Sequence, residues 1–121
     1  MTKTTEERRH TPRIETHCLV KFRPLSEPVG QWQLATLRDL GAGGAGFTHA
    51  ERYPLGTPLE LQLLLPTITA PLRAIGRICW VRASSLARSQ DYGVVFEELS
   101  PPQREEITRL VEFYRRTPST A

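Results

Sequence analysis

The stretch Asp39-Leu40-Gly41-Ala42-Gly43-Gly44-Ala45-Gly46 holds four of the eight glycines in the chain. Its spacing contains GxGxxG, which binds dinucleotides only where the glycines open a helix behind a strand. Only residues 47–53 follow before Pro54 and Gly56 interrupt the chain, so there is no room for that helix. We therefore predict a glycine-rich turn between two strands. A turn or bulge accounts for one or two of the glycines, and four also suit the close approach of a ligand or another backbone segment.

Outward from this turn, apolar and polar residues alternate as they do in half-buried strands. Before the turn, Trp32, Leu34 and Thr36 alternate against Gln31, Gln33 and Ala35, and after it we expect a short strand near residues 45–50. Residues 72–82 are long enough for the longest strand. The other alternating sets are Cys18, Val20 and Phe22; Leu59, Leu61, Leu63 and Leu65; and Tyr92, Val94 and Phe96.

The end of the chain changes to a helical period. Ser100 can cap a helix, Pro101 fits its first turn, and Gln103 can complete a capping box. One apolar stripe then follows, made of Ile107, Leu110, Val111 and Tyr114. About six short strands before one amphipathic helix predict a mainly-β fold, a small six-stranded antiparallel barrel with a C-terminal helix. Closing the barrel would remove exposed strand edges.

Composition narrows the class of protein. The chain has 121 residues, a net charge of +3 and a pI of about 9.2, which suit one domain with a mildly basic surface. No apolar run is long enough to span a membrane, and the polar start of the chain gives no signal peptide. Cys18 and Cys79 match no metal spacing, so we expect two buried thiols in the reducing cytoplasm, no metal site and no cofactor.

Residues 1–13 lack hydrophobic periodicity and carry many charges, so we predict a flexible N-terminal arm. Pro12 favours an extended chain next to Arg13, and Arg8 and Arg9 lie just before it. One interpretation is a solvated charged tail. The other is an anion and guanine clamp, because guanidinium forks fit phosphate oxygens and the O6/N7 edge of guanine, and also stack on bases.

The arm and the glycine turn together resemble the PilZ family, whose signature is RxxxR before the first strand and [DN]xSxxG at a later strand turn. Arg9 and Arg13 match the first motif, preceded by Arg8, and Asp39 and Gly44 match the second. Gly41 stands at the serine position. Residues 78–81 and 91–96 resemble the later strands of the family, so the likeness runs from about Arg8 to Arg116.

The resemblance implies a six-stranded barrel over residues 14–121 that binds cyclic di-GMP. By that match, Arg9 and Arg13 would hold guanine edges and phosphates, Arg8 would add a contact, and Asp39 would accept from guanine N–H groups. Gly44 would let the backbone turn beneath the ligand. The arm would become ordered on binding and relay the signal to a downstream protein partner.

The glycine at position 41 leaves a second hypothesis about the function open. The missing serine hydroxyl removes about one hydrogen bond, worth roughly 0.5–1.5 kcal/mol, and its backbone N–H or a water could take over. The alternative is a PilZ-fold adaptor that binds a protein partner and no nucleotide. Catalytic residues and a stripe for DNA or RNA cannot be identified in the sequence, so we expect neither an enzyme nor a nucleic-acid binder. Homodimer formation stays open.

Overall fold

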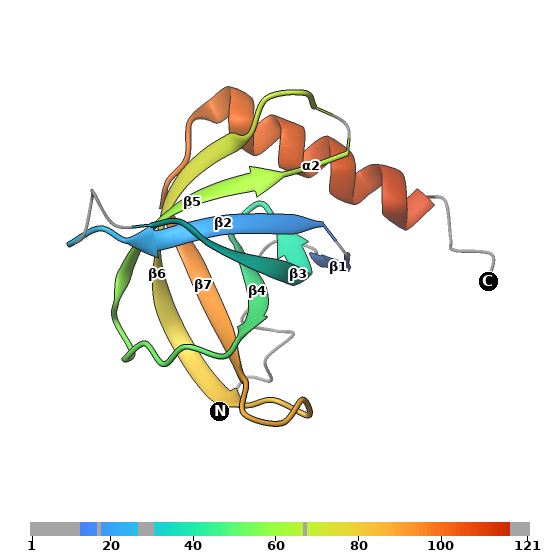
Figure 1. Ribbon diagram of the computed structural model, residues 1–121. Coiled ribbons are helices and arrows are strands. Elements are labelled where there is room, and N and C mark those ends of the chain that lie inside the picture. Colours follow the sequence, from blue (N-terminus) through green and yellow to red (C-terminus); the bar gives the residue numbers. More distant parts are fainter. Residues whose placement is uncertain (1–12, 17, 27–30, 67, 117–121) are drawn as a thin grey trace, which may run out of the picture.

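Seven strand segments and one helix make up the described part of the chain (Figure 1). The computed structural model describes residues 13–116 except 17, 27–30 and 67. The helix is α2 (Pro101–Arg116). The strands are β1 (Arg13–Glu15), β2 (Leu19–Pro24), β3 (Gln33–Gly41), β4 (Gly44–His49), β5 (Pro58–Leu64), β6 (Leu72–Ala83) and β7 (Gln90–Glu98).

The strands close into a six-stranded antiparallel barrel, as predicted. Going round it, each strand pairs with the next in the order β3, β2, β5, β6, β7, β4, and β4 pairs back onto β3. The seventh segment, β1, pairs with the end of β3 beyond β2. The first barrel strand is therefore broken in two. At the break, Thr16 N–H donates to the Arg38 carbonyl and Leu37 N–H donates to the Cys18 carbonyl.

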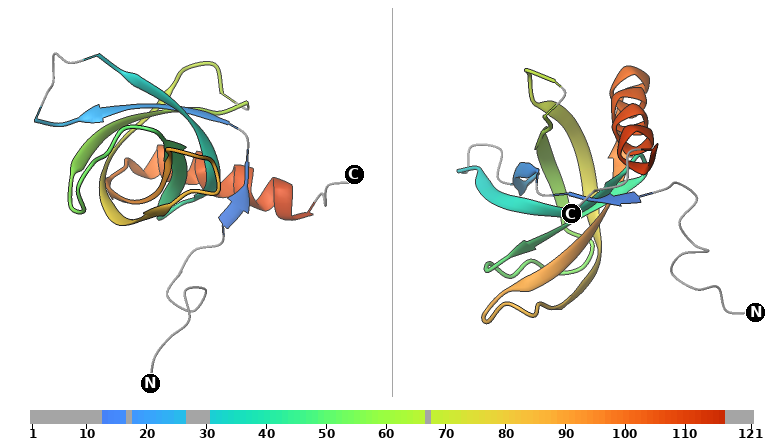
Figure 2. Two further views of the ribbon diagram at one scale, coloured as in Figure 1. Left: turned by 60° about the horizontal axis from the view of Figure 1, so that its bottom comes forward. Right: turned by 90° about the vertical axis from the view of Figure 1, so that its right-hand side faces the viewer.

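The alternating residues of the strands form the core, which lies inside the barrel that Figure 2 shows from two further sides. In β5 every second leucine, from Leu59 to Leu63, is buried, and Val20 and Phe22 of β2 and Tyr92 and Val94 of β7 face the same interior. Helix α2 packs against β1 and β3. Its buried residues are Ile107, Leu110 and Val111. Tyr114, expected on the same stripe, is 43% exposed near the end of the helix.

Strand β3 turns the opposite set of alternating residues inward from the one that its apolar pattern indicates. Ala35 and Leu37 are buried, whereas Leu34 is 54% exposed. The register with β2 explains this, because Ala35 pairs with the core residue Val20 and Leu34 pairs with Lys21. The alternation of Trp32, Leu34 and Thr36 is present, but it describes the outer face of the strand.

The prediction that both cysteines are buried is wrong. Cys79 is exposed and Cys18 is half-buried. Cys79 follows the buried Ile78 in β6, where residues 72, 74, 76 and 78 are buried, so the alternation of the strand itself turns the Cys79 side chain outward. Cys18 follows the break between β1 and β2, where its Sγ accepts from Thr16 Oγ1 at 2.8 Å.

No helix in the described part of the chain is long and apolar enough to cross a membrane. Within the same residues, no three His, Cys, Asp or Glu side chains gather where they could hold a metal ion.

Candidate ligand-binding site

The glycine stretch forms the hairpin between β3 and β4. Ala42 and Gly43 make its turn, since β3 ends at Gly41 and β4 begins at Gly44. The Gly43 carbonyl accepts from Phe96 N–H at 2.9 Å, and the Ala42 carbonyl accepts from Arg104 Nη1 at 2.9 Å. The turn is thereby fixed to β7 and to the first turns of α2. A strand rather than a helix follows the glycines, so the prediction that they are not a dinucleotide-binding fingerprint is confirmed.

Arg13 and Asp39 meet beside this hairpin, although they lie 26 residues apart in the sequence. In the β1–β3 register Arg13 pairs with Gly41 and Glu15 pairs with Asp39. Arg13 Nη1 donates to Asp39 Oδ1 at 2.7 Å, and the two side chains are 15% and 21% exposed. A guanidinium and a carboxylate are thus held together at the surface, partly shielded from water.

Two glycines of β4 lie directly under this ion pair. A Cβ atom on Gly44 would come within 2.9 Å of Arg13 Nη2 and would collide with the Val94 carbonyl oxygen. A Cβ atom on Gly46 would come within 2.7 Å of Asp39 Oδ2. Because real Cβ contacts are longer than this, only glycine fits at either position while the pair stays in place. Gly44 and Gly46 therefore form a floor without side chains.

The floor continues across β7 to a tryptophan. Asp39 pairs with Gly46, Gly46 with Gly93, and Gly93 with Trp80, so these residues form one row across four strands. The Trp80 indole lies against Gly93, where any Cβ atom would collide with its ring. The row ends in a half-buried aromatic ring, and the buried glycines beside it let the Arg13, Asp39 and Trp80 side chains lie close to the sheet. A flat heterocycle can stack on such an aromatic side chain.

At both ends of this row, a register shift between paired strands turns the side chains to the outer face. The β3–β4 register shifts between Leu37 and Asp39, so Leu37 and Leu40 are buried while Arg38 and Asp39 both face outward. The shift at Cys79 turns Trp80 to the same outer face. Bulges of this kind are common next to functional sites because they redirect side chains.

Four of the six predicted site residues come together here. Arg13 and Asp39 form the ion pair, Gly44 lies under it, and Gly41 is the buried last residue of β3, opposite Arg13. Arg8 and Arg9 lie outside the described residues, so their part in the site stays a prediction.

Sequence reasoning missed Gly46, Gly93 and Trp80 as site residues. A signal was present for Gly46, since residues two apart on a strand share a face and Gly44 was already assigned to the site. No sequence signal assigned Trp80 to the site, because its outward position depends on a bulge that only the paired strands create.

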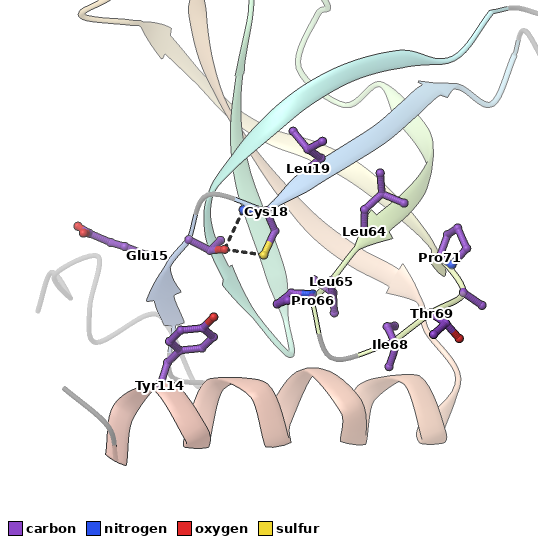
Figure 3. Close-up of a pocket in the computed structure, with 12 residues that line it drawn as sticks. Glu15, Cys18, Leu19, Leu64, Leu65, Pro66, Ile68, Thr69, Pro71 and Tyr114 are labelled. Atoms are coloured by element: carbon purple, nitrogen blue, oxygen red, sulfur yellow. Dashed lines mark hydrogen bonds between the residues drawn. The ribbon is translucent and has the colours of Figure 1, made fainter. Parts of the chain in front are cut away.

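A separate open groove of about 730 Å³ lies between the β1–β2 break, the β5–β6 connection and the end of α2 (Figure 3). Its lining is mostly apolar and includes Leu19, Leu65, Ile68 and Tyr114. Among the described residues that line it, Glu15 is the one charged side chain. This lining suits an apolar partner and does not suit an anionic nucleotide.

Comparisons with known proteins identify the family and the fold. The family model described as PilZ domain matches residues 7–113. No curated protein sequence matches the chain. Among solved structures, the PilZ domain of YcgR from Escherichia coli, solved with c-di-GMP, has a TM-score of 0.66 at 15% identity and aligns over 91% of this chain and 93% of its own.

Two further structures show the same fold. The inhibitor of motility MotI/DgrA of Bacillus subtilis has a TM-score of 0.79 at 13% identity, over 91% of this chain and 52% of its own. The PilZ domain of CeSA from a cellulose-synthesizing bacterium has a TM-score of 0.60 at 19% identity, over 86% and 98%. The chain thus spans about half of MotI and nearly all of the isolated PilZ domains. The match over most of its length, on a closed barrel with a C-terminal helix, shows that this chain belongs to the PilZ domain family.

Proposed function

We propose that the chain is a cytosolic, non-enzymatic receptor that binds cyclic di-GMP on the outer face of β3, β4 and β7. The observation that carries the proposal is the Arg13–Asp39 pair, 2.7 Å long, lying directly over Gly44 and Gly46. The structure of the YcgR PilZ domain solved with c-di-GMP supports the choice of ligand.

The chemistry of the ligand fits the residues that meet there. Cyclic di-GMP carries two phosphates and two guanines. An arginine fork binds phosphate oxygens or the O6/N7 edge of guanine, and a carboxylate accepts from guanine N1–H and N2–H groups. Asp39 Oδ1 is occupied by Arg13, whereas Oδ2 lies over Gly46. A guanine can therefore bind at Oδ2, or replace Arg13 at Oδ1 while Arg13 turns to a phosphate.

The proposal also gives a role to the arginines that precede β1. Arg8 and Arg9 precede Arg13, which begins the strand beside Asp39. We expect them to close over the bound nucleotide and so to present a changed surface to a downstream protein partner. Ordering a segment on binding lowers affinity but makes the response switchable.

Calorimetric titration with cyclic di-GMP, with GTP as the control ligand, tests the receptor function. We expect Arg13→Ala and Asp39→Ala each to weaken binding at least tenfold, because each removes hydrogen bonds to a charged group. Arg23→Ala is the matched control, since Arg23 is 19% exposed and is paired with Glu60 at 2.8 Å on β2 and β5. Unchanged affinity in both site variants, or a wild-type protein that does not bind, would contradict the proposal.

The second candidate is an adaptor that binds a protein partner and no nucleotide. The apolar groove beside Tyr114 favours it, as does the absence of a side chain at Gly41. The same titration separates the two functions, because tight binding of cyclic di-GMP at physiological salt removes the adaptor as the main function. Under the receptor proposal, Gly41→Ser should strengthen binding by up to about tenfold.

A further inference from the structure

Two arginines outside the family motifs share one buried carboxylate on the same outer face. Asp91 of β7 is 6% exposed and is the one buried charged residue in the described part of the chain. Its Oδ2 is ion-paired with Arg38 Nη1 at 2.8 Å and accepts from Arg82 Nε at 3.4 Å, while its Oδ1 accepts from Thr48 Oγ1 at 2.7 Å. Strands β3, β4, β6 and β7 thus each contribute one side chain.

The cluster carries an excess positive charge. Burial by itself would raise the pKa of Asp91, but the Thr48 hydroxyl, the Arg38 charge and hydrogen bonds from Arg82 and Ser84 together hold that pKa below its ordinary value. Asp91 is therefore ionised at neutral pH, and two guanidiniums against one carboxylate leave a net charge of +1. Both guanidiniums stay accessible, since the Arg38 and Arg82 side chains are 41% and 61% exposed.

The cluster borders the glycine floor. Asp91 pairs with Thr48 and Arg82, and Gly93, two residues along β7, pairs with Gly46 and Trp80. Two residues of a strand span about 7 Å, so the two rows are neighbours on one face. The Arg82 guanidinium also lies over the Trp80 ring, 5.0 Å from its centroid. Arg38 reaches this face because the bulge in β3 turns it outward beside Asp39.

A purely structural role, as a partner that stabilises the buried Asp91 carboxylate, explains Arg38 better than it explains Arg82. Thr48 already donates to Oδ1 of Asp91 at 2.7 Å, and Arg38 is ion-paired with Oδ2 at 2.8 Å. The Arg82 contact is longer and its side chain is largely in water, where an ion pair contributes little stability. Arg82 donates through Nε, which leaves its two terminal amino groups directed away from that bond and able to hold an anion in a fork.

We propose that Arg38 and Arg82, held in place by Asp91, form a second phosphate subsite that binds one phosphodiester of the nucleotide lying on the glycine floor. This inference rests on the proposed function, because it assigns the two phosphates of one ligand to two separate arginine groups. Arg13 holds one end of the ligand, and the pair on β3 and β6 holds the other across Gly46 and Gly93.

Calorimetric titration of Arg82→Gln with cyclic di-GMP, repeated at rising salt concentration, tests the subsite. Arg109→Gln is the matched control, because Arg109 is 63% exposed and is ion-paired with Glu106 on α2. We expect Arg82→Gln to weaken binding about tenfold and to make the affinity less dependent on salt, since one charged contact to phosphate is lost. Arg109→Gln should bind as the wild type does.

Arg38→Gln and the substitution Arg82→Lys extend the test. Arg38→Gln should weaken binding by a similar factor, and thermal unfolding shows whether that variant is folded. Arg82→Lys keeps the charge but not the fork, so its loss should be smaller than that of Arg82→Gln. Wild-type affinity in Arg82→Gln, with the wild-type protein itself binding, would overturn the subsite and leave the receptor function standing. A wild-type protein that does not bind would overturn both.

Discussion

At the scale of single residues, the site depends on two glycines as much as on the charged side chains that lie over them. The Arg13–Asp39 pair can lie flat against β4 only because positions 44 and 46 have no Cβ atom. The two glycines differ in what a methyl group would meet. At Gly44 it would collide with the backbone oxygen of Val94, which a strand pairing holds in place, whereas at Gly46 it would meet only the Asp39 side chain.

Because of this difference, alanine at position 46 should affect mainly ligand binding, and alanine at position 44 should affect protein stability. We expect Gly46→Ala to displace the Asp39 carboxylate and weaken cyclic di-GMP binding about tenfold, with a small loss in the free energy of unfolding. Gly44→Ala should lower the free energy of unfolding by about 1–3 kcal/mol, because the backbone must shift to admit the methyl group. Urea denaturation and calorimetric titration of both variants check this. Equal losses of stability in the two variants would contradict the assignment.

The resemblance to the PilZ family predicted Arg13, Asp39 and Gly44 as neighbours, because both family motifs occur in the right order and spacing along the chain. It did not predict Arg38, Arg82 or Trp80, since a strict alternation turns Arg38 to the face opposite Asp39. Both face outward only because the pairing of β3 with β4 skips one residue. Such a register shift depends on tertiary packing, which the local pattern of apolar residues does not specify.

At the scale of elements, the alternation of apolar and polar residues predicted the strands, and the capping residues before Pro101 predicted the start of the helix. Leu59, Leu61 and Leu63 face the core as expected, and α2 begins at Pro101, where Gln103 N–H donates to Ser100 Oγ at 3.4 Å. The break between β1 and β2 was not predicted. Thr16 Oγ1 accepts from Cys18 N–H at 3.0 Å, a local bond that competes with the strand ladder and could not be read from polarity alone.

The end of β4 offers a test at this scale. His49 closes the strand, and its Nδ1 accepts from Glu51 N–H at 3.1 Å, which ties the β4–β5 connection to the barrel. The imidazole meets Phe22 edge-on, with ring centroids 5.2 Å apart. Burial lowers the pKa of His49 below its ordinary value, and the charge of Glu51 offsets this only in part. The folded protein therefore favours the neutral ring, which alone can accept that hydrogen bond.

The sign of the pH dependence follows from this shift. As pH falls below about 6.5, the ordinary pKa of histidine, the unfolded chain takes up a proton before the folded one does. We expect the free energy of unfolding to decrease from pH 7 to pH 5 and then to level off once the folded His49 is also protonated. Urea denaturation at several pH values measures it. His49→Gln should lose this part of the dependence, and an unchanged pH profile in that variant would assign it to other groups.

At the scale of the whole molecule, closure of the barrel is what assembles the site. Arg13 and Arg38 come from β1 and β3, Gly46 from β4, Arg82 from β6 and Asp91 from β7, and the inner faces of most of these strands supply the core. The sequence predicted closure because six short strands would otherwise leave two edges exposed. A site spread over so many paired strands should be lost together with the fold, so ligand binding and global stability are linked.

Thermal unfolding measures that link. A ligand that binds only the folded state adds about 2.7 kcal/mol to the free energy of unfolding at a hundred times its Kd. For a domain of this size, we expect cyclic di-GMP at that concentration to raise the Tm by roughly 10 °C. At the same concentration Arg13→Ala should show about half that rise or less above its own unliganded Tm, because binding at least tenfold weaker leaves the ligand at no more than about ten times the Kd, whereas Arg23→Ala should keep the full rise. GTP should leave all three proteins unchanged. A full rise in Arg13→Ala would mean that the nucleotide binds elsewhere on the barrel, because a ligand held over Gly44 and Gly46 cannot avoid the Arg13 position.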